Sequence, residues 1–137
     1  MAVLVTRAAP GDQSTLKALQ ARGVPALSSP VLVTEFCAPP EPDLTGVQAL
    51  QVTSANAAAA MQSYAQAKAI PVLAVGDQTA AALKAVGFMR IESAQGDAAA
   101  LLDLAVARLS PDAGKVVYVR GEDVATDLAA ALAVRGF

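Results

Sequence analysis

Histidine and tryptophan are absent from the sequence, and cysteine occurs only once, as Cys37. Without histidine, the chain lacks the commonest general base and metal ligand, and Ser-His and Cys-His nucleophiles are excluded. A single cysteine excludes an internal disulfide and a zinc site built from cysteines. We therefore expect no metal site, and the scarcity of cysteine is consistent with a reducing cytoplasm.

Charge is also scarce: charged residues make up 16% of the chain, and the net charge is −2. No stripe of Lys and Arg is visible, which argues against a nucleic-acid partner, because neutralising phosphates needs clustered positive charge. The chain lacks a signal-peptide pattern and any run near the ~18 apolar residues that span a bilayer. We expect a soluble protein with no membrane partner.

Several fingerprints of nucleotide-binding and hydrolytic proteins are missing as well. The sequence has no G-x-G-x-x-G, no G-x-x-x-x-G-K-[ST] and no G-x-S-x-G, which are the dinucleotide, P-loop and nucleophile-elbow patterns. No pair of carboxylates stands out as an acid/base couple. These absences favour a site that works by positioning and backbone donors, and they leave the catalytic residue unassigned.

What the chain does contain is a regular alternation of short apolar runs and helical patterns. Such runs are typical of buried parallel strands. Strands are expected at residues 2–5, 24–29, 49–52, 71–75, 89–92 and 116–119, and helices after a cap at Asp12 and at residues 57–69, 80–86, 98–109 and 124–134. This order predicts an α/β fold with one open, mostly parallel sheet and helices on both faces.

The segment A-P-P-E-P-D at residues 38–43 marks a boundary, because prolines so closely spaced fit neither a helix interior nor a central strand. We expect a βαβ piece at residues 1–36, a linker at 37–45 and an α/β domain at 46–137. The first piece is shorter than the ~40 residues that a lone core needs.

The last predicted helix reaches Gly136 and Phe137 without a following strand, whereas earlier helices run into one. We therefore expect a chain that is part of a longer protein. The βαβ piece would then need strands from an absent segment or from a second molecule, by dimerisation or a domain swap.

Ligands of open α/β sheets bind outside the carboxyl ends of the strands. Small and hydroxyl residues dominate those ends here, and they leave helix N-terminal N–H groups open to a carboxylate or phosphate. Many of the same residues are also ordinary helix caps. The residues open to the capping interpretation are Ser54, Asn56, Asp77, Thr79, Asp97 and Asp123.

Four other side chains have alternative interpretations. Arg7 and Arg120 each follow an apolar strand, where an arginine can bind an anion or form a surface salt bridge. Tyr118 lies inside a predicted strand and Tyr64 on a predicted helix, so both are expected to pack.

The strand ends also resemble, in order and spacing, those of the uroporphyrinogen-III synthase family. The motifs that carry the resemblance are V-L-V-T-R-A (3–8), L-Q-V-T-S-A-N (50–56), V-L-A-V-G-D-Q-T-A (72–80), S-A-Q-G-D-A-A-A-L-L (93–102) and V-V-Y-V-R-G-E (116–122). The resemblance covers essentially the whole chain, and its specificity lies in the ordered set rather than in any single motif.

The resemblance implies two α/β domains joined by a two-stranded linker. The first domain is discontinuous, with an N-terminal βαβ piece that the C-terminal half of the family's chain completes. The second domain is flavodoxin-like and inserted between these parts. This matches the boundary at residues 38–43.

The implied activity is cyclisation of the linear tetrapyrrole hydroxymethylbilane, a polycarboxylate, with inversion of ring D and loss of water. No metal or organic cofactor is implied. The tyrosine that the family uses to assist loss of the hydroxyl matches neither Tyr64 nor Tyr118. The candidate substrate-binding residues carried over are Arg7, Thr53, Ser54, Asn56, Gly76, Thr79, Arg120 and Gly121. The rival hypothesis is a non-catalytic α/β module that binds a small anion.

Overall fold

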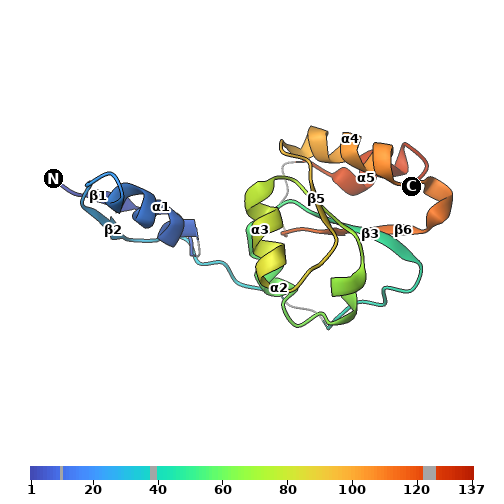
Figure 1. The fold of residues 1–137 in the computed structure, drawn as a ribbon, viewed down its shortest axis with the longest axis horizontal. Helices are drawn as coiled ribbons and strands as arrows, with labels where there is room; N and C mark the ends of the chain where they lie inside the picture. Colours follow the sequence, from blue (N-terminus) through green and yellow to red (C-terminus); the bar gives the residue numbers. More distant parts are fainter. Residues whose placement is uncertain (10, 38–39, 122–125) are drawn as a thin grey trace. The chain divides into compact units, whose positions relative to one another are not determined.

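The computed structural model describes residues 1–137 except 10, 38–39 and 122–125. The chain divides into two compact units, residues 1–37 (unit 1) and residues 38–137 (unit 2). Each unit contains parallel strands and helices, which confirms the predicted α/β class (Figure 1). In the described part of the chain, no helix is both long and apolar enough to cross a membrane.

Unit 1 is a single βαβ unit. Its strands β1 (Val3–Val5) and β2 (Ala26–Ser28) pair in parallel, and the helix α1 (Gly11–Gln20) connects them. The second strand is shorter than the predicted range of 24–29, and residues 31–36 form neither helix nor strand. Three residues of each strand pair in register.

Much of the apolar surface of unit 1 is exposed, although parallel sheets are normally covered on both faces. The exposed large apolar side chains of this unit are Met1, Val3, Leu4, Leu27, Val31, Leu32, Val33 and Phe36. Val5 is the one strand residue of this unit that is buried. The core of unit 1 is therefore small.

A buried carboxylate links the helix of unit 1 to its second strand. The Asp12 side chain is only 4% exposed, and its Oδ2 accepts a hydrogen bond of 2.7 Å from the Ser28 hydroxyl. The prediction of Asp12 as a helix cap is wrong, because α1 begins at Gly11 and places Asp12 in its first turn. The Ser28 hydroxyl lowers the pKa of Asp12, since a hydrogen bond to the carboxylate favours the ionised form.

Replacing Ser28 with Ala should raise the pKa of Asp12, because the main stabilising donor is lost. The native bond lowers the folded-state pKa, so its contribution to stability is present above the ordinary Asp value and is lost as pH falls through the folded value. NMR titration of the carboxyl carbon would measure the change, with Ser29→Ala as the matched control. An unchanged Asp12 pKa in Ser28→Ala would contradict the assignment.

Unit 2 is built on a four-stranded parallel sheet with the order β5-β4-β3-β6. The strands are β3 (Val47–Val52), β4 (Val72–Ala74), β5 (Ile91–Ser93) and β6 (Lys115–Val119). The inner strand β3 ends in the sequence Ala49-Leu50-Gln51-Val52, each residue of which is at most 1% exposed. The parallel sheet was predicted from such short apolar runs.

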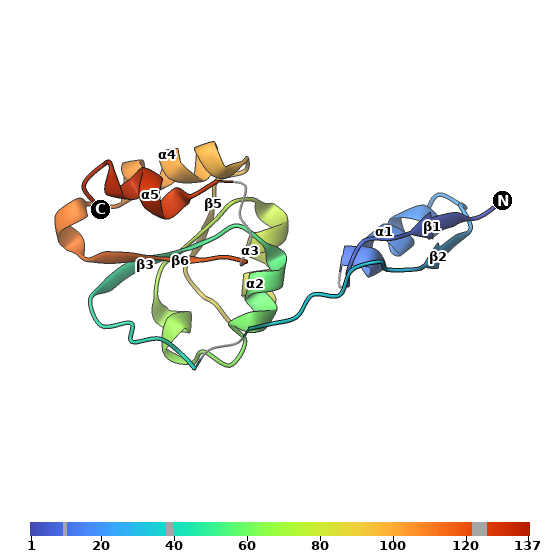
Figure 2. The ribbon, with the colours of Figure 1, turned by 180° about the vertical axis from the view of Figure 1, so that it is seen from behind.

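Helices cover both faces of this sheet, as predicted (Figures 1 and 2). The helical segments of unit 2 are α2 (Ala55–Ala60), η1 (Gln66–Ala69), α3 (Asp77–Ala85), α4 (Ala98–Arg108), η2 (Pro111–Ala113) and α5 (Leu128–Ala133). On one face, α2 and α3 pack with Leu50 and Val52, while α4 and α5 cover the other face around Leu73.

The predicted continuous helix at residues 57–69 is wrong, because α2 ends at Ala60 and a separate 3-10 segment, η1, begins at Gln66. The Glu41 carboxylate binds the start of the second segment. Its Oε1 accepts hydrogen bonds from the backbone N–H groups of Gln66 and Ala67, at 2.9 and 3.0 Å. Those groups therefore have partners outside the helix. Tyr64, between the two segments, packs against the core as predicted.

Other boundaries shift by a few residues. α3 begins at Asp77 rather than at 80, and β5 occupies 91–93 rather than 89–92. The Asp127 side chain caps α5 by accepting a hydrogen bond from the Ala130 N–H at 3.0 Å. The predicted start of that helix at 124 and the predicted cap at Asp123 lie outside the described residues.

The start of β6 is held against the start of β3. Gln48 donates hydrogen bonds from its Nε2 to the carbonyls of Ser110 and Gly114, at 2.8 and 2.6 Å. Gly114 has a φ of +128°, and a Cβ there would collide with the carbonyl of Gly46. Glycine is therefore required at 114 by both its backbone conformation and this close approach.

Candidate functional site

The strand order of unit 2 creates a topological switch point between β3 and β6. From β3 the chain proceeds through α2 to β4 on one side, whereas β6 pairs with β3 on its other side. The helix after β3 covers one face of the sheet, and the helix after β6 covers the opposite face. Ligands of open α/β sheets bind where successive connections diverge in this way. We define the switch point as residues 53–56 and 120–121.

Thr53 is the first residue of the switch point. It follows directly after β3, is half-buried, and its Oγ1 lies 3.3 Å from the hydroxyl of Tyr118 on β6. This contact joins residues 65 positions apart in the sequence. Tyr118 was predicted to be a core residue, and its ring does pack with the cluster under α4 and α5. Its hydroxyl, which lies at the switch point, was missed.

Ser54 and Asn56 lie at the start of α2. Ser54 is the cap, because its side-chain oxygen accepts a hydrogen bond of 3.2 Å from the Asn56 N–H. The capping interpretation is therefore confirmed for Ser54, while Asn56 lies inside the helix. Capping does not remove Ser54 from reach, because its side chain is exposed.

Arg120 and Gly121 complete the switch point after β6, and both are exposed. The register pairs Val52 with Val119, so the residues that follow the two strands leave the sheet at the same level. A guanidinium at this position can bind carboxylates in the bidentate manner that a lysine cannot. The structure thus brings Thr53, Ser54 and Arg120 to one part of the sheet edge.

Gly76 and Thr79 follow β4, the other neighbour of β3. Gly76 is the N-terminal cap residue of α3, and it offers no side-chain hydrogen bond there. Asp77 and Thr79 lie inside the first turn of the helix, so neither is its cap residue. Thr79 is only 5% exposed, and a ligand would meet the backbone of Gly76 before it met the Thr79 hydroxyl.

Arg7 belongs to unit 1, in the turn after β1. Its guanidinium donates a hydrogen bond of 3.3 Å to the Thr15 hydroxyl on α1. The group also lies against Gly11, where a Cβ would come within 2.6 Å of the Arg7 Nε. Arg7 is exposed and is described within unit 1 alone.

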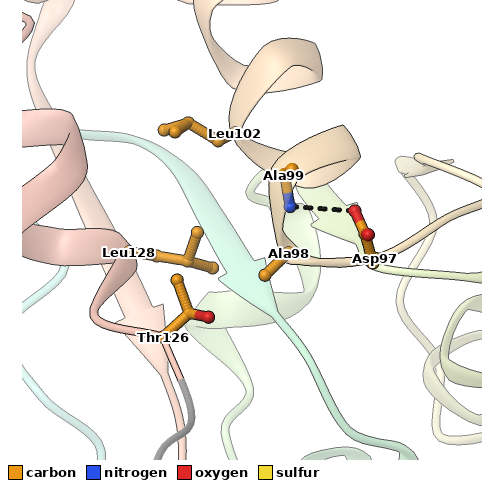
Figure 3. Close-up of a pocket in the computed structure, with 6 residues that line it drawn as sticks. All are labelled: Asp97, Ala98, Ala99, Leu102, Thr126 and Leu128. Carbon is orange, nitrogen blue, oxygen red and sulfur yellow. Dashed lines mark hydrogen bonds between the residues drawn. The ribbon is translucent and has the colours of Figure 1, made fainter.

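A pocket of about 340 Å³ opens between the starts of α4 and α5 (Figure 3). Its lining residues are Asp97, Ala98, Ala99, Leu102, Thr126 and Leu128. The Asp97 carboxylate caps α4, as the sequence allowed, by accepting hydrogen bonds from the N–H groups of Ala99 and Ala100 at 3.0 and 3.1 Å. These donors are therefore occupied, and a negative group already stands at the helix end. The pocket is apolar and unsuited to a carboxylate.

Metal ligands are not gathered anywhere in the described part of the chain: it holds no group of three His, Cys, Asp or Glu residues placed to bind one ion. The chemistry available at the switch point is that of hydroxyls, backbone N–H groups and a guanidinium. These are donors, and they suit a ligand that carries several carboxylates.

Removing the cap of α4 tests the local structure at the pocket. Asp97→Ala should lower the free energy of unfolding of unit 2 by about 1 kcal/mol, because two backbone N–H groups lose their acceptor. Denaturant unfolding followed by circular dichroism measures the loss. Asp103→Ala, which removes an exposed carboxylate from the middle of the same helix, is the matched control and should change stability little. Equal effects of the two substitutions would refute the capping role.

Comparison with protein families relates the chain to a known family. A family model described as uroporphyrinogen-III synthase HemD matches residues 13–137, which is most of unit 1 and all of unit 2. A search of the curated proteins found no match.

Proposed function

The chain belongs to the uroporphyrinogen-III synthase family of tetrapyrrole biosynthesis, and from this premise we propose that it cyclises hydroxymethylbilane with inversion of ring D and loss of water. The reaction is that of a lyase. The observation that supports the proposal best is the convergence of Thr53, Ser54 and Arg120 at the switch point. These donors suit the carboxylates of a linear tetrapyrrole.

The residues proposed to contact substrate differ in what they offer. Thr53 and Ser54 provide hydroxyls, and Arg120 provides a charged, planar donor. Asn56, Gly76 and Gly121 lie beside them at the same edge of the sheet, where backbone N–H groups add further donors. Thr79, in the first turn of α3, and Arg7, which is described within unit 1 alone, remain proposed substrate contacts.

The proposed mechanism relies on positioning. Ionisation of the hydroxymethyl group of hydroxymethylbilane is intrinsically easy. Without an enzyme, the linear tetrapyrrole therefore closes without inversion and gives the type I isomer. Donors that hold the carboxylates of the folded substrate reduce the conformations open to it and favour attack by the inverted ring. Such a site needs fixed donors and no proton-transferring histidine, which the chain lacks.

We also propose that unit 1 is one piece of a discontinuous domain, as the family's organisation implies. The exposed strand residues Val3, Leu4 and Leu27 support this proposal, because they leave a parallel sheet uncovered. Partner strands would come from another segment or from a second copy.

The isomer ratio of the product tests the activity. The chain is mixed with freshly prepared hydroxymethylbilane, the products are oxidised, and chromatography separates the type III and type I isomers. We expect type III above the level formed without protein. Only type I, accompanied by saturable binding of the substrate, would instead identify a non-catalytic binding module.

Arg120 tests the proposed recognition of carboxylates. Arg120→Gln should raise the KM for hydroxymethylbilane about tenfold or more, because a hydrogen bond to a charged group contributes about 1.5–3 kcal/mol. Arg135→Gln is the matched control, since Arg135 is also exposed and its guanidinium donates to the Ala131 carbonyl on α5. An equal rise of KM in both variants would show that only net charge matters.

A further inference from the structure

Gln51, the second-to-last residue of the inner strand β3, carries a buried amide that has no hydrogen-bond partner among the described residues. The residue is 0% exposed, and neither its Nε2 nor its Oε1 forms a hydrogen bond. An unsatisfied buried polar group destabilises the folded state, because the hydration it loses on burial is not replaced. In native proteins the large majority of buried polar groups are hydrogen-bonded, so each exception needs an explanation. Gln51 therefore requires an explanation that packing does not provide.

The position of Gln51 relates it to the switch point. Its neighbours Leu50 and Val52 pack against α2 and α3, so the alternation of the strand directs Gln51 to the face that α4 and α5 cover. Tyr118 lies directly across from Gln51 on β6 and packs on this same face. Thr53, two residues beyond Gln51, shares the face and contacts the Tyr118 hydroxyl.

Three polar side chains thus lie on one face of the sheet near the ends of β3 and β6. Gln51 and Tyr118 lie side by side at the same level, and Thr53 follows at the switch point, in contact with the Tyr118 hydroxyl. A hydroxyl has one hydrogen to donate, whereas an amide nitrogen has two. If the Tyr118 hydroxyl donates to Thr53, the hydrogen of the Thr53 hydroxyl is free for a ligand, and the oxygen of Tyr118 is free to accept from Gln51.

We propose that Gln51, Tyr118 and Thr53 form a hydrogen-bonded relay that closes when a carboxylate of the substrate binds at the end of β3. The Gln51 amide donates to Tyr118, Tyr118 donates to Thr53, and Thr53 donates to the carboxylate. Gln51 and Tyr118 are positioning residues, because they act through Thr53. The choice of ligand rests on the proposed function.

Two physical effects favour the relay. Hydrogen bonds in a chain polarise one another, so each donor strengthens the next, and the gain is largest in a low-dielectric interior. A carboxylate at the end of the chain strengthens all of its members, since hydrogen bonds to charged groups are stronger than neutral ones. Binding would also give the Gln51 amide the partner that it lacks.

The absorbance of tyrosine reports on this relay directly. The chain has no tryptophan and only two tyrosines, so a Tyr64→Phe background leaves Tyr118 as the one phenol. Titration with tricarballylate, a tricarboxylate that is transparent in this range, should shift the Tyr118 band to longer wavelength in a saturable manner, because a phenol that donates more strongly absorbs further to the red. The midpoint of the titration gives the Kd of the complex.

Two substitutions in this background test the order of the relay. Thr53→Val keeps the shape of the side chain and removes the hydroxyl, so the shift should disappear. Gln51→Met keeps the volume and removes the amide, so the shift should shrink and the Kd should rise several-fold. Gln51→Met should melt no lower than its parent, because the replaced amide has no partner. Tyr118→Phe in the native sequence is the control, and Tyr64 should then show no response.

The relay is refuted if the Tyr64→Phe protein shows no saturable shift, if the shift persists in Thr53→Val or is unchanged in Gln51→Met, or if Gln51→Met melts lower. The synthase activity and the relay are tested by different measurements, so the failure of one can be told from the failure of the other. A protein that shows the shift and forms only the type I isomer retains the relay without the synthase activity, and one that forms type III without the shift retains the activity without the relay.

Discussion

Burial of β3 on both faces is the constraint on which the rest of unit 2 depends. Its residues 49–52 are at most 1% exposed, and the strand pairs with β4 on one side and β6 on the other. A strand buried in this way needs helices above and below it. Because all neighbours are parallel, every connection from a strand to its helix starts at the same edge of the sheet. The parallel sheet therefore places the proposed substrate-binding donors of unit 2 at one edge.

Local sequence determined much of this fold. Short apolar runs such as residues 49–52 predicted the strands, and Asp97 was identified as a possible cap because capping depends on neighbouring residues alone. The predictions for the helix at 57–69 and for the cap at Asp12 were wrong, and both segments contact a residue that is distant in the sequence. Glu41 binds the backbone of Gln66 from 25 positions away, and no local pattern in residues 57–69 reveals that. Asp12 likewise binds Ser28, so its carboxylate serves the tertiary structure rather than the helix end.

The candidate site was predictable as a set of residues but not as an arrangement. The residues after each strand could be identified, whereas the strand order that places Arg120 beside the end of β3 could not, because the chain passes β4 and β5 before it returns. For Tyr118, the sequence predicted the position of the ring but not the contact of its hydroxyl. Its ring packs, as an apolar strand context predicts, but its hydroxyl reaches Thr53. The pairing of Gln51 with Tyr118 also depends on register.

The unequal cores of the two units have a consequence for the energetics of the chain. Unit 1 is held by two three-residue strands and a few buried side chains, whereas unit 2 has apolar clusters on both faces of its sheet. Parts of a chain that differ this much in buried apolar surface can open with separate free energies. We expect unit 1 to open at a lower free energy than unit 2, and one melting temperature then does not describe the whole chain. Amide hydrogen exchange, resolved by residue, would measure the opening free energies of unit 1 and unit 2 separately.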